Sequence, residues 1–251
     1  NKLNEVPYMD SLTGKNAVVF GGSSNIGLAI ARRFASEGAN VTIVARNEDK
    51  LKEAVASIGH GATYAQVDAA NDDQVAKFFE PFEQVDLLAT CAGSFVFGAI
   101  DELPVSEWEE LFAPRFFGQI RACHYAVPKM PAGSVIMLCS GIAARAGIVE
   151  YAGGAGLCGA VNSMGKVMAM ELAPREIRVN VLSPGLIIDR PAHEDLKLDD
   201  PVNSLRREFV ERIPMGRPGF PEDMAEAAMF LAKCDYATGM VLDVDGGWTT
   251  I

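Results

Sequence analysis

The chain has 251 residues, 49% of them hydrophobic, with a formal net charge of −11 and a pI of about 4.8. This size suits one α/β domain over residues 1–251 with a single large core. The acidic balance argues against nucleic acid and membrane surfaces as partners, and no apolar run approaches the ~20 residues of a membrane span. The five cysteines are scattered without metal-ligand spacing, so we expect reduced thiols, no metal site and a cytoplasmic protein.

Short β-branched runs alternate with longer helical patterns along the chain. The expected strands cover 17–20, 41–45, 63–67, 86–90, 134–139, 177–182 and 240–244, and the expected helices cover 26–36, 47–57, 105–129, 157–172 and 221–232. The strands are apolar throughout, which is typical of a sheet covered on both faces. We therefore predict a Rossmann-type, doubly wound parallel sheet of about seven strands with helices on both faces. The long, charged segment 189–214 is the predicted substrate lid.

A glycine-rich turn follows the first strand and opens the first helix. Its residues are Gly21, Gly22, Ser23, Ser24, Asn25, Ile26 and Gly27. In this position the backbone N–H groups and the helix dipole point toward a pyrophosphate, although an ordinary strand-to-helix turn is the alternative interpretation. Asn25 is compatible with such a turn because asparagine enters left-handed backbone conformations readily.

Further motifs follow later strands: Asp68 after the third, Cys91-Ala92-Gly93 after the fourth, and Pro184-Gly185 after the sixth. Together with the glycine-rich turn and the segment 214–247, they resemble the short-chain dehydrogenase/reductase family over residues 14–248. The resemblance implies a nicotinamide dinucleotide and a small-molecule substrate. It places the following residues at the cofactor: Gly21, Ser23, Ser24, Asn25, Ile26, Gly27, Arg46, Asp68, Ala69, Ala92, Gly93, Pro184, Gly185 and Ile187.

Two residues bear on which dinucleotide binds. Arg46 lies just past the second strand, where an NAD enzyme of this family usually carries an acidic residue near the ribose. A guanidinium there can pair with a 2′-phosphate, so we predict NADP(H); a solvated surface arginine is the alternative. Asp189 stands where the family usually has a threonine, and we assign it to the substrate or the lid.

The catalytic tetrad implied by the resemblance is altered. The family uses Asn, Ser, Tyr and Lys, and the Tyr donates a proton to the carbonyl oxygen while hydride adds to carbon. Aligned on the flanking motifs, this chain has Arg115 for the Asn, retains Ser140, and has Gly154 and Cys158 for the Tyr and Lys. No Lys or Arg lies between residues 145 and 166, which excludes a shifted Tyr-x-x-x-Lys.

The remaining candidates for catalysis are Arg115, Ser140, Glu150, Tyr151 and Asp189. Tyr151 precedes Cys158 by seven residues, the Tyr-to-Lys spacing of the enoyl-reductase branch, and is either a substrate-facing hydroxyl or an aromatic of the pocket wall. Without the Lys, its pKa should stay near ~10. We interpret Cys158 as a buried filler rather than a nucleophile. Arg115 would be costly to bury unpaired, so we expect it to pair with Glu150 or to turn outward.

An arginine and a carboxylate in place of the tetrad also resemble fungal NADPH-dependent iminium reductases/Diels–Alderases of indole alkaloid pathways. Reducing a carbonyl requires a proton donor, whereas reducing an iminium yields a neutral amine and requires none. We therefore predict an NADP(H)-dependent reductase of an iminium or similarly activated substrate in secondary metabolism, with assistance to a cyclisation as an additional option. A non-redox cyclase or isomerase, or a catalytically silent paralogue that acts as a binding or subunit protein, are the alternatives.

We also predict a homo-oligomer, a dimer or tetramer. The family commonly associates through the two long helices that flank the fifth strand. The later helix carries small residues that permit close backbone approach, namely Gly156, Gly159, Ala160 and Gly165.

Overall fold

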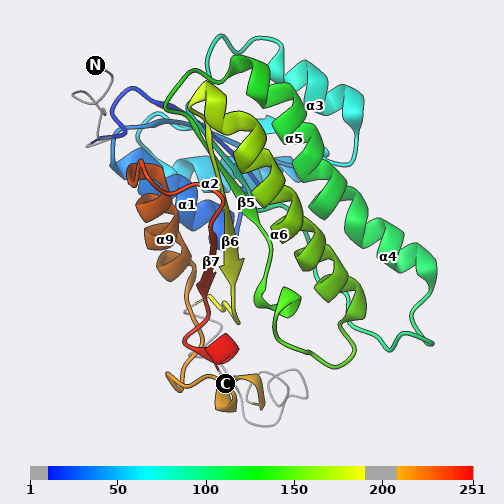
Figure 1. Ribbon diagram of the computed structural model, residues 1–251. Helices are drawn as coiled ribbons and strands as arrows, with labels where there is room; N and C mark the ends of the chain where they lie inside the picture. The colour runs from blue at the N-terminus through cyan, green and yellow to red at the C-terminus, as the bar shows by residue number, and fades with distance from the viewer. Residues whose placement is uncertain (1–10, 190–207, 251) are drawn as a thin grey trace.

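The computed structural model describes residues 11–189 and 208–250. Its centre is a seven-stranded parallel sheet with the strand order β3-β2-β1-β4-β5-β6-β7 (Figure 1). The strands are β1 (Asn16–Phe20), β2 (Asn40–Ala45), β3 (Thr63–Gln66), β4 (Leu87–Thr90), β5 (Val135–Cys139), β6 (Arg178–Pro184) and β7 (Val241–Val244). The predicted doubly wound sheet is thereby confirmed. Strand order reverses between β1 and β4, and in such sheets ligands bind at the carboxyl ends of the strands beside this point.

Helices cover both faces of the sheet (Figure 1). One layer holds α1 (Asn25–Ser36), α2 (Glu48–Ile58) and α9 (Pro221–Lys233); the other holds α3 (Asp72–Phe79), α4 (Val105–Phe112), α5 (Gly118–Ala126) and α6 (Ala152–Leu172). Successive side chains of a strand enter opposite layers: Val19 packs with the first layer, and Val18 and Phe20 pack with the second. This double burial is the reason why the strands read as uninterrupted apolar runs.

The expected single helix over 105–129 is interrupted. After α4 the backbone forms a π-helical turn over Ala113–Phe117 before α5 begins, and the last turn, Val127–Lys129, is a 3-10 helix. Pro114 lies inside the π turn and has no N–H to donate to the preceding turn, which accounts for the break in the α-helical ladder. The irregular turn contains Arg115, and it therefore decides where that side chain points.

Two further helices differ from the prediction. α6 begins at Ala152, five residues before the expected start, because the glycines of its first turns weaken the helical signal. α3 was not predicted; it is short, and the side chain of Asn71 caps it by accepting a hydrogen bond from the Gln74 N–H. The predicted lid falls largely on residues 190–207, which lie outside the described residues. Within the described ranges, every helix is too short or too polar to span a bilayer.

Candidate active site

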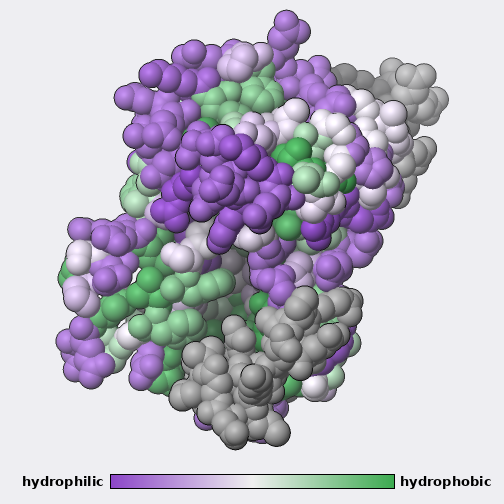
Figure 2. Space-filling view, turned by 180° about the vertical axis from the view of Figure 1, so that it is seen from behind, coloured by the Kyte–Doolittle hydropathy of each residue, from purple (hydrophilic) through white to green (hydrophobic). Residues whose placement is uncertain are grey.

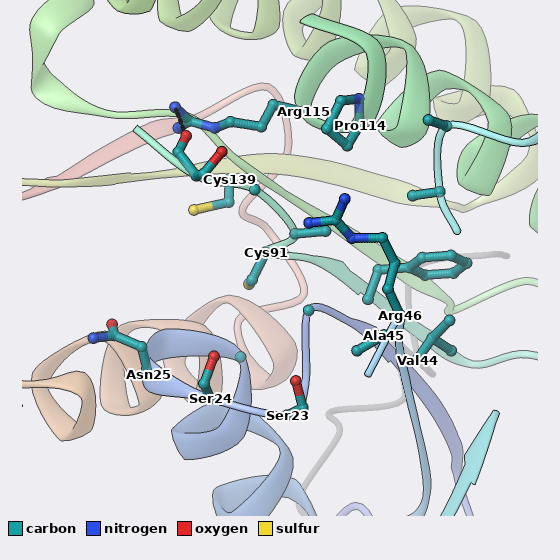
Figure 3. A pocket seen from close by; sticks show the side chains of 18 of the residues that line it. Ser23, Ser24, Asn25, Val44, Ala45, Arg46, Cys91, Pro114, Arg115 and Cys139 are labelled. Carbon is teal, nitrogen blue, oxygen red and sulfur yellow. Dashed lines mark hydrogen bonds between the residues drawn. The ribbon is translucent and has the colours of Figure 1, made fainter. Parts of the chain in front are cut away.

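A cavity of about 720 Å³ opens at the carboxyl ends of the strands, where β1, β4 and β5 meet the loops that follow them (Figure 3). It is lined by every residue that the sequence assigned to the cofactor except Gly185 and Ile187, together with Arg115 and Ser140. Gly185 and Ile187 lie in the segment that follows β6. The Gly185 N–H donates to the Val244 carbonyl, and Ile187 pairs with Gly219 in an isolated parallel β-bridge. The predicted cofactor residues thus lie around one cleft.

The glycine-rich turn has the geometry of a phosphate cradle. Gly21 has a φ of +75°, and a Cβ there would lie 2.6 Å from the Ala92 nitrogen; a Cβ at Gly27 would overlap the Gly21 carbonyl. Asn25 adopts the expected left-handed conformation with a φ of 45°. Its Oδ1 accepts a hydrogen bond from the Ile26 N–H at 2.8 Å, so this side chain occupies one donor of the helix N-terminus. Close backbone packing keeps the turn open for a pyrophosphate.

Arg46 lies directly after β2 and lines the end of the cleft beside that strand. It is exposed, and Figure 3 shows its guanidinium extending into the pocket. Within the part of the chain that the structure describes, this guanidinium forms no ion pair. Lys50 lines the same end of the cavity. Asp68 is half-buried and its Oδ1 accepts a hydrogen bond from the Ala70 N–H, which fixes the loop that follows β3.

Arg115 is buried, with 7% of its surface exposed. Its Nη1 donates to the Ser94 carbonyl at 3.2 Å and to the Tyr151 hydroxyl at 3.3 Å, and its guanidinium lies 5.0 Å from the centre of the Phe95 ring. A Cβ at Gly93 would overlap the Arg115 side chain, so the glycine makes room for it. The arginine turns into the site rather than outward, and the loop that follows β4 holds it there.

Tyr151 precedes α6 and places its ring against the helix. The ring stacks on Phe97 with centroids 4.6 Å apart. A Cβ at Gly154 would lie within 2.5 Å of three of its ring carbons, so the Tyr151 ring fills the space that a side chain at 154 would take. Burial raises the pKa of the Tyr151 hydroxyl, and nearby Arg115 opposes this rise in part. The hydroxyl therefore keeps its proton at neutral pH, and it accepts from Arg115 while its own O–H remains able to donate.

The expected Arg115–Glu150 pair does not form. Glu150 is exposed, with a left-handed φ of 60°, and its backbone carbonyl accepts from the Gly98 N–H. The chain reverses direction at this residue, so that Tyr151 enters the interior while the Glu150 side chain stays in solvent. Asp189 is exposed as well, and its Oδ2 accepts a 3.4 Å hydrogen bond from the Asn25 side chain beside the glycine-rich turn.

Ser140 and Cys158, which stand at predicted tetrad positions, are both buried. The Ser140 hydroxyl lines the cavity and has no hydrogen-bond partner among the described residues, which suits a group that binds a ligand there. Burial raises the pKa of the Cys158 thiol to about 11, so Cys158 remains a neutral thiol, in agreement with its interpretation as a filler.

Sequence reasoning missed the residues that hold this centre in place. Gln119 is buried and bridges three elements: its Nε2 donates to the Arg115 and Cys139 carbonyls, and its Oε1 accepts from the Thr90 hydroxyl. The signal available in the sequence was a single polar residue on the buried face of α5. Phe95 lines the cavity, and Figure 2 shows hydrophobic surface beside the hollow in this side of the molecule.

Comparisons with known proteins agree with this geometry. Residues 21–249 match the family model described as enoyl-(acyl carrier protein) reductase. The chain is 35% identical to 3beta-hydroxysteroid dehydrogenase 1 of Eggerthella lenta, over 96% of this chain and 95% of that protein. It is 34% identical to 2,5-dichloro-2,5-cyclohexadiene-1,4-diol dehydrogenase of Sphingobium indicum, over 95% and 97% of the two chains. A solved short chain dehydrogenase/reductase family protein superimposes with a TM-score of 0.84 at 30% identity, covering 96% of this chain and 100% of that one.

Proposed function

The chain belongs to the short-chain dehydrogenase/reductase family of oxidoreductases, and from that premise we propose that it uses NADP(H) to reduce an activated double bond of a small molecule. The observation that carries this proposal is that Gly154 and Cys158 stand at the usual Tyr and Lys positions, while a buried Arg115 at the usual Asn position donates a hydrogen bond to Tyr151. The cleft retains its phosphate cradle, whereas the Tyr–Lys pair that would protonate an alkoxide is absent.

The preference for NADP(H) is supported by Arg46. Its guanidinium enters the cleft after β2 without an acidic partner in the described residues, and Lys50 lies at the same end. Two cations there suit the 2′-phosphate that distinguishes NADP(H) from NAD(H). Gly27, in the first turn of α1, would offer its backbone N–H to the pyrophosphate, whereas the Gly21 N–H already donates to the Val44 carbonyl. The Ser140 hydroxyl, which has no hydrogen-bond partner among the described residues, would face the reacting end. When bound, the reduced dinucleotide supplies a hydride.

The absence of the Tyr–Lys proton donor restricts the classes of substrate that can be reduced. Reduction of a simple ketone leaves an alkoxide, a strong base that needs a proton at once, and the Tyr–Lys pair that supplies it is replaced by Gly154 and Cys158. The Tyr151 hydroxyl is a weaker acid than a Lys-assisted Tyr, because burial raises its pKa. Two substrate classes avoid this requirement. Hydride addition to an iminium leaves a neutral amine, and hydride addition to the β-carbon of an enone leaves an enolate, which is a much weaker base than an alkoxide.

The charge of Arg115 favours the second class. Its guanidinium has no acidic partner within the described residues, so the field beside Tyr151 is positive. A fixed positive group stabilises an oxygen on which negative charge develops and repels a cation at the same place. We therefore propose an α,β-unsaturated carbonyl whose oxygen accepts from the Tyr151 hydroxyl. An apolar body on this substrate would fit the aromatic wall formed by Phe95 and Phe97.

An iminium is the second candidate, and the exposed carboxylate of Asp189 beside the glycine-rich turn favours it. This carboxylate accepts a hydrogen bond from Asn25, which lines the cavity. A substrate cation bound there would be held at the rim of the cleft, away from Arg115. The two candidates therefore predict opposite effects when the charge of Arg115 is removed.

The test is a turnover panel with NADPH and matched enone, cyclic iminium and simple ketone substrates. We expect the enone to be reduced and the ketone to be almost inert. Arg115→Gln removes the charge beside the Tyr151 donor and should lower the kcat for the enone, by at most the about 10²–10³-fold that loss of an oxyanion donor itself costs, while NADPH affinity changes little. Arg115→Lys, which keeps the charge, should retain part of the activity. An iminium that is turned over faster in Arg115→Gln than in the unchanged protein would favour the second candidate.

Tyr151→Phe distinguishes reduction of an enone from reduction of an iminium. If the hydroxyl hydrogen-bonds to the enolate oxygen, the variant should lose kcat for the enone and leave iminium reduction unchanged, because an amine product needs no such donor. Rapid ketone reduction that survives this substitution would contradict the proposed site. NADPH binding with no reduction of any substrate in the panel would instead indicate a catalytically silent paralogue.

We also propose that the protein is a homo-oligomer. Figure 1 shows α6 and the α4–α5 segment side by side on the outside of the sheet. Large apolar side chains are exposed along these helices, namely Phe117, Ile120, Val167 and Met170. Exposed apolar residues on neighbouring helices are typical of a surface that a second subunit covers.

A further inference from the structure

Two cysteines lie side by side on the floor of the cleft. Cys91 directly follows β4, and Cys139 is the last residue of β5. The strands pair in parallel with Thr90 opposite Leu138, so the next residues along the chains, Cys91 and Cys139, stand opposite each other. Both are half-buried and line the cavity. Figure 3 shows both sulfur atoms in the pocket, between Arg115 and the Ser23–Asn25 loop.

The two thiols lie close enough to affect each other's pKa. The Cys91 thiol and the nearby Arg115 guanidinium lower the pKa of Cys139, whereas the Cys139 thiol and burial raise the pKa of Cys91. Cys139 is therefore the member of the pair that more readily forms the nucleophilic thiolate.

The backbone geometry permits a bond between them. Residues opposite each other on neighbouring strands are about 4.8 Å apart, which is within the ~4.4–6.8 Å between the Cα atoms of bridged cysteines. Gln119 holds the end of β5 through hydrogen bonds at 2.9 and 3.2 Å to the Cys139 carbonyl and N–H. The other three cysteines are placed differently: Cys123 and Cys158 are buried, and Cys234 ends α9.

We propose that Cys91 and Cys139 form an oxidation site for hydroperoxides, at which the two thiols close into a reversible disulfide. Cys139 releases its proton, the thiolate attacks the peroxide oxygen and the O–O bond breaks; the departing hydroxide takes up the released proton, so that hydrogen peroxide yields a sulfenic acid and one water. The Cys91 thiol then attacks the sulfenic sulfur, the S–S bond forms, and a second water leaves. The two thiols lose two electrons, which reduce the peroxide.

The site lies within the dinucleotide cleft, so oxidation and cofactor binding should exclude each other. This consequence rests on the proposed binding of NADP(H), whereas disulfide formation itself does not. With NADPH at ten times its Kd, about one molecule in eleven is free, and closure of the disulfide should slow by about tenfold. Oxidised protein should bind NADPH more weakly than reduced protein, and a thiol reductant should restore binding.

The experiment is peptide mapping of protein treated with hydrogen peroxide. Trypsin places the two cysteines on separate peptides, 78–115 and 130–145, so their disulfide joins two fragments that a reductant separates. We expect this linked pair as the main product. Cys91→Ser should abolish it and leave Cys139 as a sulfenic acid that dimedone traps. Cys234→Ser is the matched control, a half-buried cysteine away from the cleft, and should form the linked pair at the unchanged rate.

Two results would overturn the proposal. One is oxidation of Cys234 while Cys91 and Cys139 stay reduced, because the cleft thiols would then have no special reactivity. The other is a Cys139 that forms no dimedone adduct in Cys91→Ser. If the disulfide forms but NADPH does not slow it, the oxidation site stands and the proposed cofactor binding fails, so the two proposals are tested separately.

Discussion

Replacing Gly154 by alanine tests the position of the Tyr151 ring. A Cβ at residue 154 would lie within 2.5 Å of three ring carbons of Tyr151, so the ring has to leave the space that it fills. Its stacking on Phe97 and its hydrogen bond with Arg115 would be lost with it. We therefore expect loss of both stability and turnover from the addition of one methyl group.

The magnitude follows from a comparison with Gly156 on the same helix. Alanine is favoured over glycine by about 1 kcal/mol in a helix interior, and this gain applies to both positions. Within the single chain a Cβ at Gly156 meets nothing within 4 Å, so Gly156→Ala should stabilise the fold of the subunit, provided that the oligomer mass is unchanged. Overpacking at Gly154 costs about 1–3 kcal/mol, so Gly154→Ala should be less stable than Gly156→Ala by that amount.

The assay is thermal unfolding followed by circular dichroism at one protein concentration, with the oligomer mass checked by light scattering in the same samples. In a domain of this size, each kcal/mol corresponds to about 2–4 °C in Tm. Tyr151→Ala should remove the clash, so its combination with Gly154→Ala should cost less than the sum of the single changes. Equal Tm values for Gly154→Ala and Gly156→Ala would refute the placement of the ring.

Three further predictions concern the cofactor, pH and assembly. Arg46→Ala should remove most of the preference for NADPH over NADH and spare NADH affinity, as measured by titration; equal affinities in the unchanged protein would contradict the role of Arg46. Burial raises the pKa of Cys158 to about 11, so the folded protein keeps a proton that the unfolded chain releases near pH 9, and stability should fall between pH 9 and 11 by up to about 1.4 kcal/mol per pH unit. In urea titrations, Cys158→Ala should show a smaller fall over this range. Light scattering at micromolar concentration should give a dimer or tetramer, and Phe117→Glu should shift it toward the monomer; a monomeric mass for the unchanged protein would rule out the proposed interface.

The sequence determined the sheet because the cause is local to each strand. A strand buried on both faces needs apolar side chains at every position, and the run 135–139 shows this pattern in the sequence. The glycine-rich turn was also predicted from the sequence. The structure gives the reason for its glycines, because a Cβ at Gly21 or Gly27 would overlap the backbone. The prediction that the family's Tyr and Lys are missing also rests on the sequence alone, because no Lys or Arg lies between 145 and 166.

Only the tertiary structure decided which side chains occupy the place of the missing Tyr and Lys. The direction of Arg115 depends on a π-helical turn, and its contacts with Ser94 and Tyr151 join positions 21 and 36 residues away in the chain. Glu150 has a left-handed backbone conformation and its side chain is exposed, so the Arg115–Glu150 ion pair expected from the charges does not form. Cys91 and Cys139 became neighbours through strand register. These outcomes depend on packing between distant segments, and no periodicity within one segment records such packing.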